Sequence, residues 1–230
     1  MDKIRKVIPA LDVTDLGQIE KLVKAIDAQD IIYGYKAGFS LGLTHGLPKV
    51  VETIRRYSSK PIIYDHQKAA TDIPDTGKLF ARTMKESGID EVILFPQAGP
   101  VTLEAWVKAV QEFDMKVIVG GIMTHPKFVV SEGGFIRDEA VIEMYQTSHQ
   151  LNVKSFVVPL TKPEAVKKLY EEADLDEDCA FYSPGYGKQG GDAAQFAFLK
   201  THYMIIGRSL LQAEDPEQYL NGVQEELNQI

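Results

Sequence analysis

Short apolar runs alternate with longer amphipathic stretches along the whole chain. Short runs rich in β-branched and aromatic residues predict strands, and apolar positions three and four residues apart predict helices. The predicted strands are residues 7–12, 31–36, 61–65, 91–95, 116–120, 155–159, 180–183 and 203–207. The predicted helices are residues 16–28, 48–57, 77–87, 101–113, 138–151, 162–173, 192–199 and 216–227. Eight strand–helix units in 230 residues favour an α/β fold of the closed (β/α)8 TIM-barrel type over an open doubly wound sheet.

Composition narrows the class of protein. No linker-like stretch or internal repeat interrupts the alternation, so residues 1–230 are expected to form a single domain. The net charge of -8 leaves no basic surplus for a nucleic-acid partner. The sequence has neither a signal-like apolar core near its start nor an apolar run of the roughly 20 residues that a membrane span needs. With a single cysteine, Cys179, which can form no internal disulfide, these features indicate a cytoplasmic protein without a membrane partner.

Charged residues close the first three predicted strands. Asp12 ends the first strand, Lys36 the second and Asp65 the third, and Lys68 and Asp72 follow closely. Barrels of this type place their chemistry at the C-terminal ends of strands, so these side chains are candidate catalytic groups. Each one alone also has an ordinary structural explanation, as a helix cap or a solvated surface charge.

Lys36 is the least easily explained as a surface charge, because it closes the apolar and aromatic run 31–35. A buried ammonium there requires carboxylate partners. The candidates are Asp12, Asp65 and Asp72.

Two glycine-containing segments follow the last two predicted strands. Residues 183–192 read Ser-Pro-Gly-Tyr-Gly-Lys-Gln-Gly-Gly-Asp, and Gly207, Arg208 and Ser209 follow the eighth strand. Glycines permit close backbone approach to a ligand, and free amides beside a guanidinium bind anions. Since barrels of this type often hold phosphate in these two loops, the pattern predicts a phosphorylated ligand.

Several of these segments resemble the orotidine 5′-monophosphate decarboxylase family, and the resemblance spans nearly the whole chain. The most specific pieces are Asp72-Ile73-Pro74-x-Thr76 and the Gly-x-Gly-x-Gln-Gly-Gly-Asp run of residues 185–192; Lys36-Ala37-Gly38 and Thr124-His125-Pro126 add to them. The resemblance implies metal-independent decarboxylation of orotidine 5′-monophosphate to uridine 5′-monophosphate in de novo pyrimidine synthesis. It also implies a homodimer with shared active sites, and no cofactor.

The resemblance assigns roles to individual residues. It implies a charged catalytic network of Lys36, Asp65, Lys68 and Asp72. The residues implied to bind substrate are Asp12 and Lys36 at the ribose, Thr124 at the pyrimidine, and Gln189, Gly207 and Arg208 at the phosphate. It further implies that Asp72 and Thr76 reach the neighbouring subunit's site, and residues 182–191 are expected to form a lid. Lys68 is expected to stabilise the carbanion at pyrimidine C6 and to protonate it.

One departure from the family pattern concerns Lys68. The family places aspartate, lysine and aspartate as Asp-x-Lys-x-x-Asp, whereas Asp65, Lys68 and Asp72 are spaced as Asp-x-x-Lys-x-x-x-Asp. The backbone after Asp65 must therefore turn or bulge for Lys68 to face the barrel mouth. If it does not, Gln67 takes its place and cannot donate the proton. Two other functions stay open: a magnesium-dependent sugar-phosphate decarboxylase or aldolase of the same superfamily, and a non-catalytic barrel that binds a phosphorylated ligand, which the altered spacing around Lys68 allows.

Overall fold

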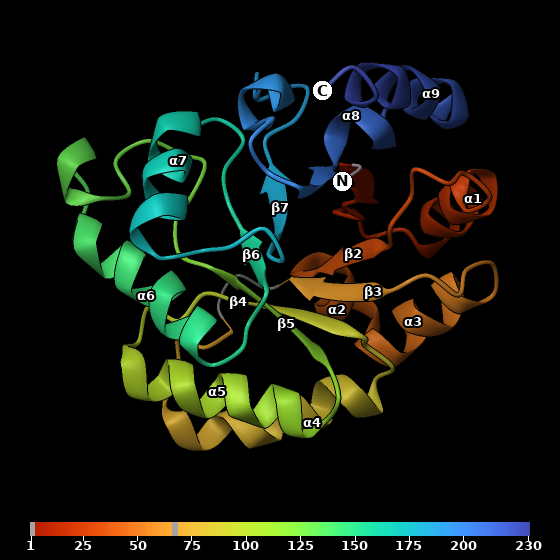
Figure 1. The fold of residues 1–230 in the computed structure, drawn as a ribbon. Coiled ribbons are helices and arrows are strands. Elements are labelled where there is room, and N and C mark those ends of the chain that lie inside the picture. The colour runs from red at the N-terminus through yellow and green to blue at the C-terminus, as the bar shows by residue number, and fades with distance from the viewer. Residues whose placement is uncertain (1–2, 66–68) are drawn as a thin grey trace.

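The computed structural model describes residues 3–65 and 69–230, and its eight strands form one parallel sheet curved into a barrel (Figure 1). The strands are β1 Ile4–Pro9, β2 Tyr35–Gly38, β3 Ile62–Asp65, β4 Glu91–Leu94, β5 Lys116–Gly120, β6 Ser155–Val157, β7 Ala180–Pro184 and β8 Thr201–Ile206. From β2 to β8 each strand pairs with the next in sequence, β8 pairs with β1, and only isolated bridges link β1 to the segment of β2. Between β1 and β2, backbone hydrogen bonds from Val7 N to Ile31 O and from Leu11 N to Lys36 O close the ring. The predicted TIM barrel is confirmed.

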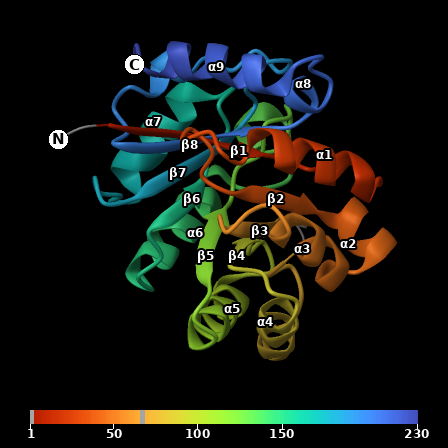
Figure 2. The same ribbon diagram turned by 90° about the vertical axis from the view of Figure 1, so that its right-hand side faces the viewer.

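Helices surround the barrel (Figure 1). The α-helices are α1 Leu16–Ile26, α2 Phe39–His45, α3 Leu47–Arg55, α4 Gly77–Glu86, α5 Pro100–Glu112, α6 Asp138–Gln150, α7 Pro163–Glu172, α8 Arg208–Leu211 and α9 Pro216–Leu227. Three short 3₁₀ helices, η1 Pro74–Thr76, η2 Val130–Glu132 and η3 Ala193–Phe196, lie in loops. In Figure 2, α4 and α5 lie side by side and the two chain ends lie near each other; there Lys3 Nζ donates to Ile230 O.

Three helices differ from the prediction: α2 and the short α8 were not predicted, and the helix expected at residues 192–199 does not form. Helix α2 was not predicted because it buries only Leu41 and leaves Phe39 and Leu43 exposed, so it lacks the apolar stripe by which helices are predicted. The helix predicted at residues 192–199 is wrong: only the 3₁₀ turn η3 forms, begun by Asp192, whose side chain accepts from Ala194 N.

The strands obey a two-residue alternation that separates the barrel interior from the helix layer. On β3, Ile63 belongs to the interior cluster, and Asp65, two residues later, lies at the barrel mouth. The interior cluster is Ile8, Ala10, Ile63, Ile93, Phe95, Ile118, Val157, Ala180, Tyr182, Tyr203 and Ile205. The larger cluster fills the space between sheet and helices. No helix in residues 3–65 and 69–230 is long and apolar enough to cross a bilayer.

Candidate active site

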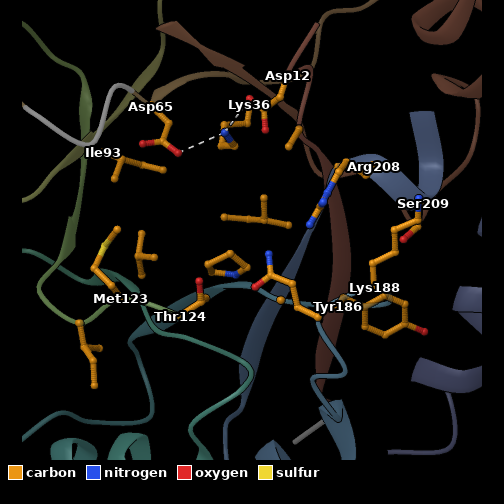
Figure 3. A pocket seen from close by; sticks show the side chains of 18 of the residues that line it. Asp12, Lys36, Asp65, Ile93, Met123, Thr124, Tyr186, Lys188, Arg208 and Ser209 are labelled. Atoms are coloured by element: carbon orange, nitrogen blue, oxygen red, sulfur yellow. Dashed lines mark hydrogen bonds and ion pairs between the residues drawn. The ribbon is translucent and has the colours of Figure 1, made fainter. Parts of the chain in front are cut away.

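A cavity of about 250 Å³ opens at the C-terminal ends of the strands. Its lining comes from every part of the chain: Ala10, Asp12, Lys36, Asp65, Ile93, Phe95, Ile122, Met123, Thr124, Val157, Pro184, Gly185, Tyr186, Lys188, Gln189, Ile205, Gly207, Arg208 and Ser209. Figure 3 shows Asp12, Lys36 and Asp65 at one end of the cavity, and Arg208, Ser209 and Lys188 at the other. The cavity therefore has a mixed-charge end and a cationic end.

Lys36 is the centre of the mixed-charge end. Its Nζ lies 3.1 Å from Asp65 Oδ2 and 3.4 Å from Asp12 Oδ1. Burial by itself lowers the pKa of the Lys36 ammonium, but Asp65 and then Asp12 favour the charged form, so the pKa lies above its ordinary value. Two of the three predicted carboxylate partners are thus in place, and they keep Lys36 a cation facing the cavity.

Gly38, the last residue of β2, makes room for Asp12. A Cβ on Gly38 would lie 2.7 Å from Asp12 Oδ1. Asp12 follows β1 and Lys36 lies in β2, so the absence of a side chain at Gly38 lets the two strand ends bring Asp12 next to Lys36. This is a physical reason for the sequence Lys36-Ala37-Gly38.

Asp65 is buried, and its second oxygen, Oδ1, accepts no hydrogen bond from any described side chain or backbone group. The predicted proton donor Lys68, and its alternative Gln67, lie outside the described residues. The next described residue is Ala69. Its carbonyl accepts a hydrogen bond of 2.9 Å from the amide of Phe95, the residue just after β4. Ala70 then adopts a left-handed conformation with φ of 68°, a local turn that alanine rarely makes.

Asp72 and Thr76 do not line the cavity. The Asp72 side chain is exposed, and among described residues its only hydrogen bond is the one it accepts from Ile73 N. Helix α5 fixes the backbone here, because Thr102 Oγ1 donates to Asp72 O and Trp106 Nε1 donates to Ile73 O. Of the predicted charged network, the described structure thus gathers Lys36 and Asp65, adds Asp12, and leaves Asp72 facing outward.

The cationic end is built from the loop after β7 and the start of α8. Three glycines of the loop, Gly185, Gly187 and Gly190, have φ values of 115°, 75° and 74°, which side chains disfavour. Gln189 and Arg208 face the same cavity, beside Gly207. All three residues predicted at the phosphate are therefore brought together.

Thr124, predicted at the ring, also lines the cavity, on the loop after β5. The sequence prediction missed the apolar lining from Ile93, Phe95 and Met123. Ile93 and Phe95 lie at the end of β4, two residues apart, and this strand-end position is the signal that could have identified them.

The predicted lid segment begins too early in the sequence. Tyr182 belongs to β7 and is fully buried, and its hydroxyl accepts from Lys116 Nζ inside the barrel. The loop proper therefore starts after Pro184.

Three side chains of the kinds that bind metals lie together away from the cavity, and a lysine ammonium already lies among them. His149, Asp176 and Cys179 bring ligand atoms within 4.8 Å of one another. Lys154 Nζ lies 2.7 Å from Asp176 Oδ2 and 2.8 Å from His149 Nε2, so an ammonium holds the position that a cation would take. Burial raises the pKa of the Cys179 thiol to about 11, which disfavours the thiolate that metals bind.

Comparison with known families agrees with this geometry. The model of the "Orotidine 5'-phosphate decarboxylase / HUMPS family" matches residues 5–222, nearly the whole chain. The chain belongs to this family. An orotidine 5′-phosphate decarboxylase of Methanococcoides burtonii is 30% identical over 228 residues, covering 99% of this chain and all of that protein. One of Methanocaldococcus jannaschii is 29% identical over 226 residues, covering 97% of this chain and 99% of that protein.

Solved decarboxylase structures share the fold of this family member. The Methanocaldococcus jannaschii enzyme complexed with the inhibitor BMP superposes with a TM-score of 0.84 at 27% identity, covering 98% of this chain and 99% of that chain. The enzyme of Pyrococcus horikoshii superposes with a TM-score of 0.79 at 26% identity, covering 96% and 99% of the two chains. The barrel, with its helices, therefore matches the decarboxylase fold over nearly its full length.

Proposed function

We propose that this chain removes the carboxylate of orotidine 5′-monophosphate to give uridine 5′-monophosphate and carbon dioxide, in de novo pyrimidine synthesis in the cytoplasm. The observation that carries the proposal is the pair of opposite ends in one cavity. Lys36 held by Asp12 and Asp65 lies at one end, and Arg208 with Gln189 lies at the other. A nucleotide whose phosphate lies at Arg208 presents its ribose and ring toward the charged group.

The phosphate is remote from the reacting carbon, so its binding energy serves to position the ring. Gln189, Gly207 and Arg208 bind the phosphate in this assignment. Asp12 and Lys36 bind the ribose hydroxyls, and Thr124 contacts the pyrimidine.

The chemical step breaks the bond between C6 and the carboxylate carbon, and the electron pair stays on C6. An ammonium next to C6 stabilises this charge and then transfers a proton to C6. The amine that remains later regains its proton from water. Lys68 is the assigned donor. Two features of the residues on either side of Lys68 support it. Asp65 Oδ1 accepts no hydrogen bond from any described residue, and Ala69 is hydrogen-bonded to Phe95, which lines the cavity.

The direct test is the loss of orotidine 5′-monophosphate absorbance on mixing with the purified protein in excess EDTA. Loss of absorbance supports a metal-independent decarboxylase. Absence of turnover with uridine 5′-monophosphate still bound identifies a non-catalytic binding barrel. Turnover that EDTA abolishes and magnesium restores identifies the metal-dependent alternative of the same superfamily.

We further propose a homodimer in which Asp72 and Thr76 complete the partner's site. The backbone at Asp72 is held by α5 while its carboxylate points outward. Exposed apolar side chains follow β2, β3 and β4, close to the barrel mouth: Phe39, Leu43, Ile73, Leu79 and Val101. If a second copy of the chain covers these side chains, Asp72 of the first copy would lie at the cavity of the second copy.

Mixing two inactive variants tests the shared site. In a hybrid of Lys36→Ala with Asp72→Asn, one cavity has both native residues and the other has neither. Co-refolding equal amounts is expected to restore about a quarter of wild-type activity, since half of the dimers are hybrids with one intact site. The matched control, Lys36→Ala with Asp65→Asn, recovers nothing because both residues belong to the same cavity. Equal recovery, or none, in the two mixtures contradicts the shared site.

A further inference from the structure

Lys188 provides a second cation at the phosphate end of the cavity. It lines the cavity together with Arg208 and Ser209, and Figure 3 shows the three side chains on the same side. Within residues 3–65 and 69–230, neither Lys188 nor Arg208 forms an ion pair with an aspartate or glutamate. In a protein with net charge -8, this end of the cavity is therefore locally positive.

Packing of the adjacent loop backbone fixes the place at which the Lys188 side chain begins. A Cβ on Gly187 would lie 2.7 Å from Ser209 Oγ, so the loop backbone is pressed against the first turn of α8. The hydroxyl of Tyr219 on α9 lies 3.7 Å from the same position. The root of the Lys188 side chain is thereby held beside Arg208.

The hydrogen-bond partner of Lys188 is neutral, so the positive charge of the lysine is not neutralised. Lys188 Nζ donates to Oε1 of Gln212, a neutral amide at the end of α8. A bond between an ammonium and a phosphate oxygen is stronger than one to a neutral amide, because both groups carry charge. Lys188 can thus exchange Gln212 for an anion without losing a carboxylate partner.

A nucleoside 5′-phosphate carries between about one and a half and two negative charges near pH 7, which one guanidinium does not neutralise. We propose that Lys188 is a second phosphate ligand, which leaves Gln212 and binds the dianion opposite Arg208. The inference rests on the proposed function, since it requires a nucleotide whose phosphate lies at Arg208. It adds a specificity-determining residue that favours the phosphorylated over the unphosphorylated nucleoside.

Two matched variants separate this role from a structural one. Lys188→Met removes the cation and keeps the stem, whereas Gln212→Met breaks the same hydrogen bond and keeps the cation. By calorimetry in phosphate-free buffer, Lys188→Met is expected to weaken uridine 5′-monophosphate binding about tenfold, with a shallower salt dependence. Gln212→Met is expected to stay within about twofold of wild type, and Lys188→Arg to restore most of the affinity. Uridine, which lacks the phosphate, should bind all variants alike.

The outcomes distinguish this inference from the proposed function. Equal weakening by Lys188→Met and Gln212→Met shows that their bond only holds the loop, and it overturns the inference. So does unchanged nucleotide affinity in Lys188→Met, provided that wild type prefers the nucleotide to uridine. If wild type shows no such preference, the phosphate site at Arg208 is itself wrong, and the proposed function fails with it.

Discussion

The two ends of the barrel each hold a lysine beside carboxylate, but the balance between burial and the attraction of the carboxylate differs between them. At the mouth, Asp65 and Asp12 raise the pKa of Lys36 despite its burial. At the N-terminal end, Glu91 and Lys116 begin β4 and β5 and are directly paired in register. There burial dominates: it raises the pKa of Glu91 and lowers that of Lys116, and their mutual attraction only partly opposes it.

The surroundings explain this difference. Lys116 lies 3.7 Å from Glu91, and its Nζ donates to the hydroxyls of Tyr33 and Tyr182. Tyr33 stacks on Tyr203 and donates to Glu91 Oε1 at 2.5 Å. The tyrosines close this end of the barrel and bury Glu91, while the Lys116 side chain stays 38% exposed; Lys36, by contrast, is buried beside two carboxylates and faces a cavity. The mouth thus keeps a charge ready for a ligand, and the closed end uses its charges to fill and specify the interior.

The largest contrast is expected from removing each lysine. Lys36→Met should lower kcat/KM for orotidine 5′-monophosphate by about a thousandfold, because a preorganised charge in the site is lost. Lys116→Met, the matched change at the closed end, should keep kcat/KM of the folded protein within about twofold. Steady-state kinetics, with circular dichroism to verify folding, measure both. An inactive but folded Lys116→Met, or an active Lys36→Met, would remove the functional distinction between the two ends.

A second contrast concerns stability at the closed end. Glu91→Leu leaves Lys116 without its carboxylate and should lower the free energy of unfolding by about 2 kcal/mol, less than for a fully buried pair because the Lys116 side chain is 38% exposed. Adding Lys116→Met should recover much of this loss, because such a pair can be replaced by apolar side chains more easily than it can be halved. Urea denaturation measures both variants. A double variant no more stable than Glu91→Leu would show that Lys116 without its carboxylate costs the fold nothing, and it would contradict this account.

The smallest expected effect is a difference in pH dependence. Because the pKa of Glu91 is raised in the folded state, the folded protein binds more protons than the unfolded chain above the ordinary glutamate pKa. The stability contribution of Glu91 is therefore present below that value and is lost as pH rises through the folded pKa.

The stability of wild type relative to Glu91→Gln should accordingly fall with rising pH, by at most about 1.4 kcal/mol per pH unit. Urea denaturation of both proteins at a series of pH values from acid to neutral gives the difference curve. A difference that is flat, or that rises with pH, contradicts the dominance of burial at Glu91.

Much of the mouth was predictable from local sequence, since a polar residue that ends an apolar strand lies at the barrel mouth. Asp12, Lys36, Asp65 and the glycine-rich loop were identified in this way. The closed end was not identified, because Glu91 and Lys116 begin ordinary strands and no local pattern distinguishes them from solvated charges. Helix α2 was also missed, since its exposed apolar residues hide its period.

By itself, the sequence determined the strand–helix alternation and which polar residues lie near the C-terminal ends of strands, because these depend on neighbours a few positions apart; most strand boundaries differ from the prediction by one to three residues. Only the tertiary structure decided which strand ends meet. The contact of Asp12 with Lys36, of Tyr33 with Glu91, and the shared cavity of Lys188 and Arg208 all depend on closing the ring and on the register between strands. Register is fixed by packing of the whole interior, which no local segment of the chain contains.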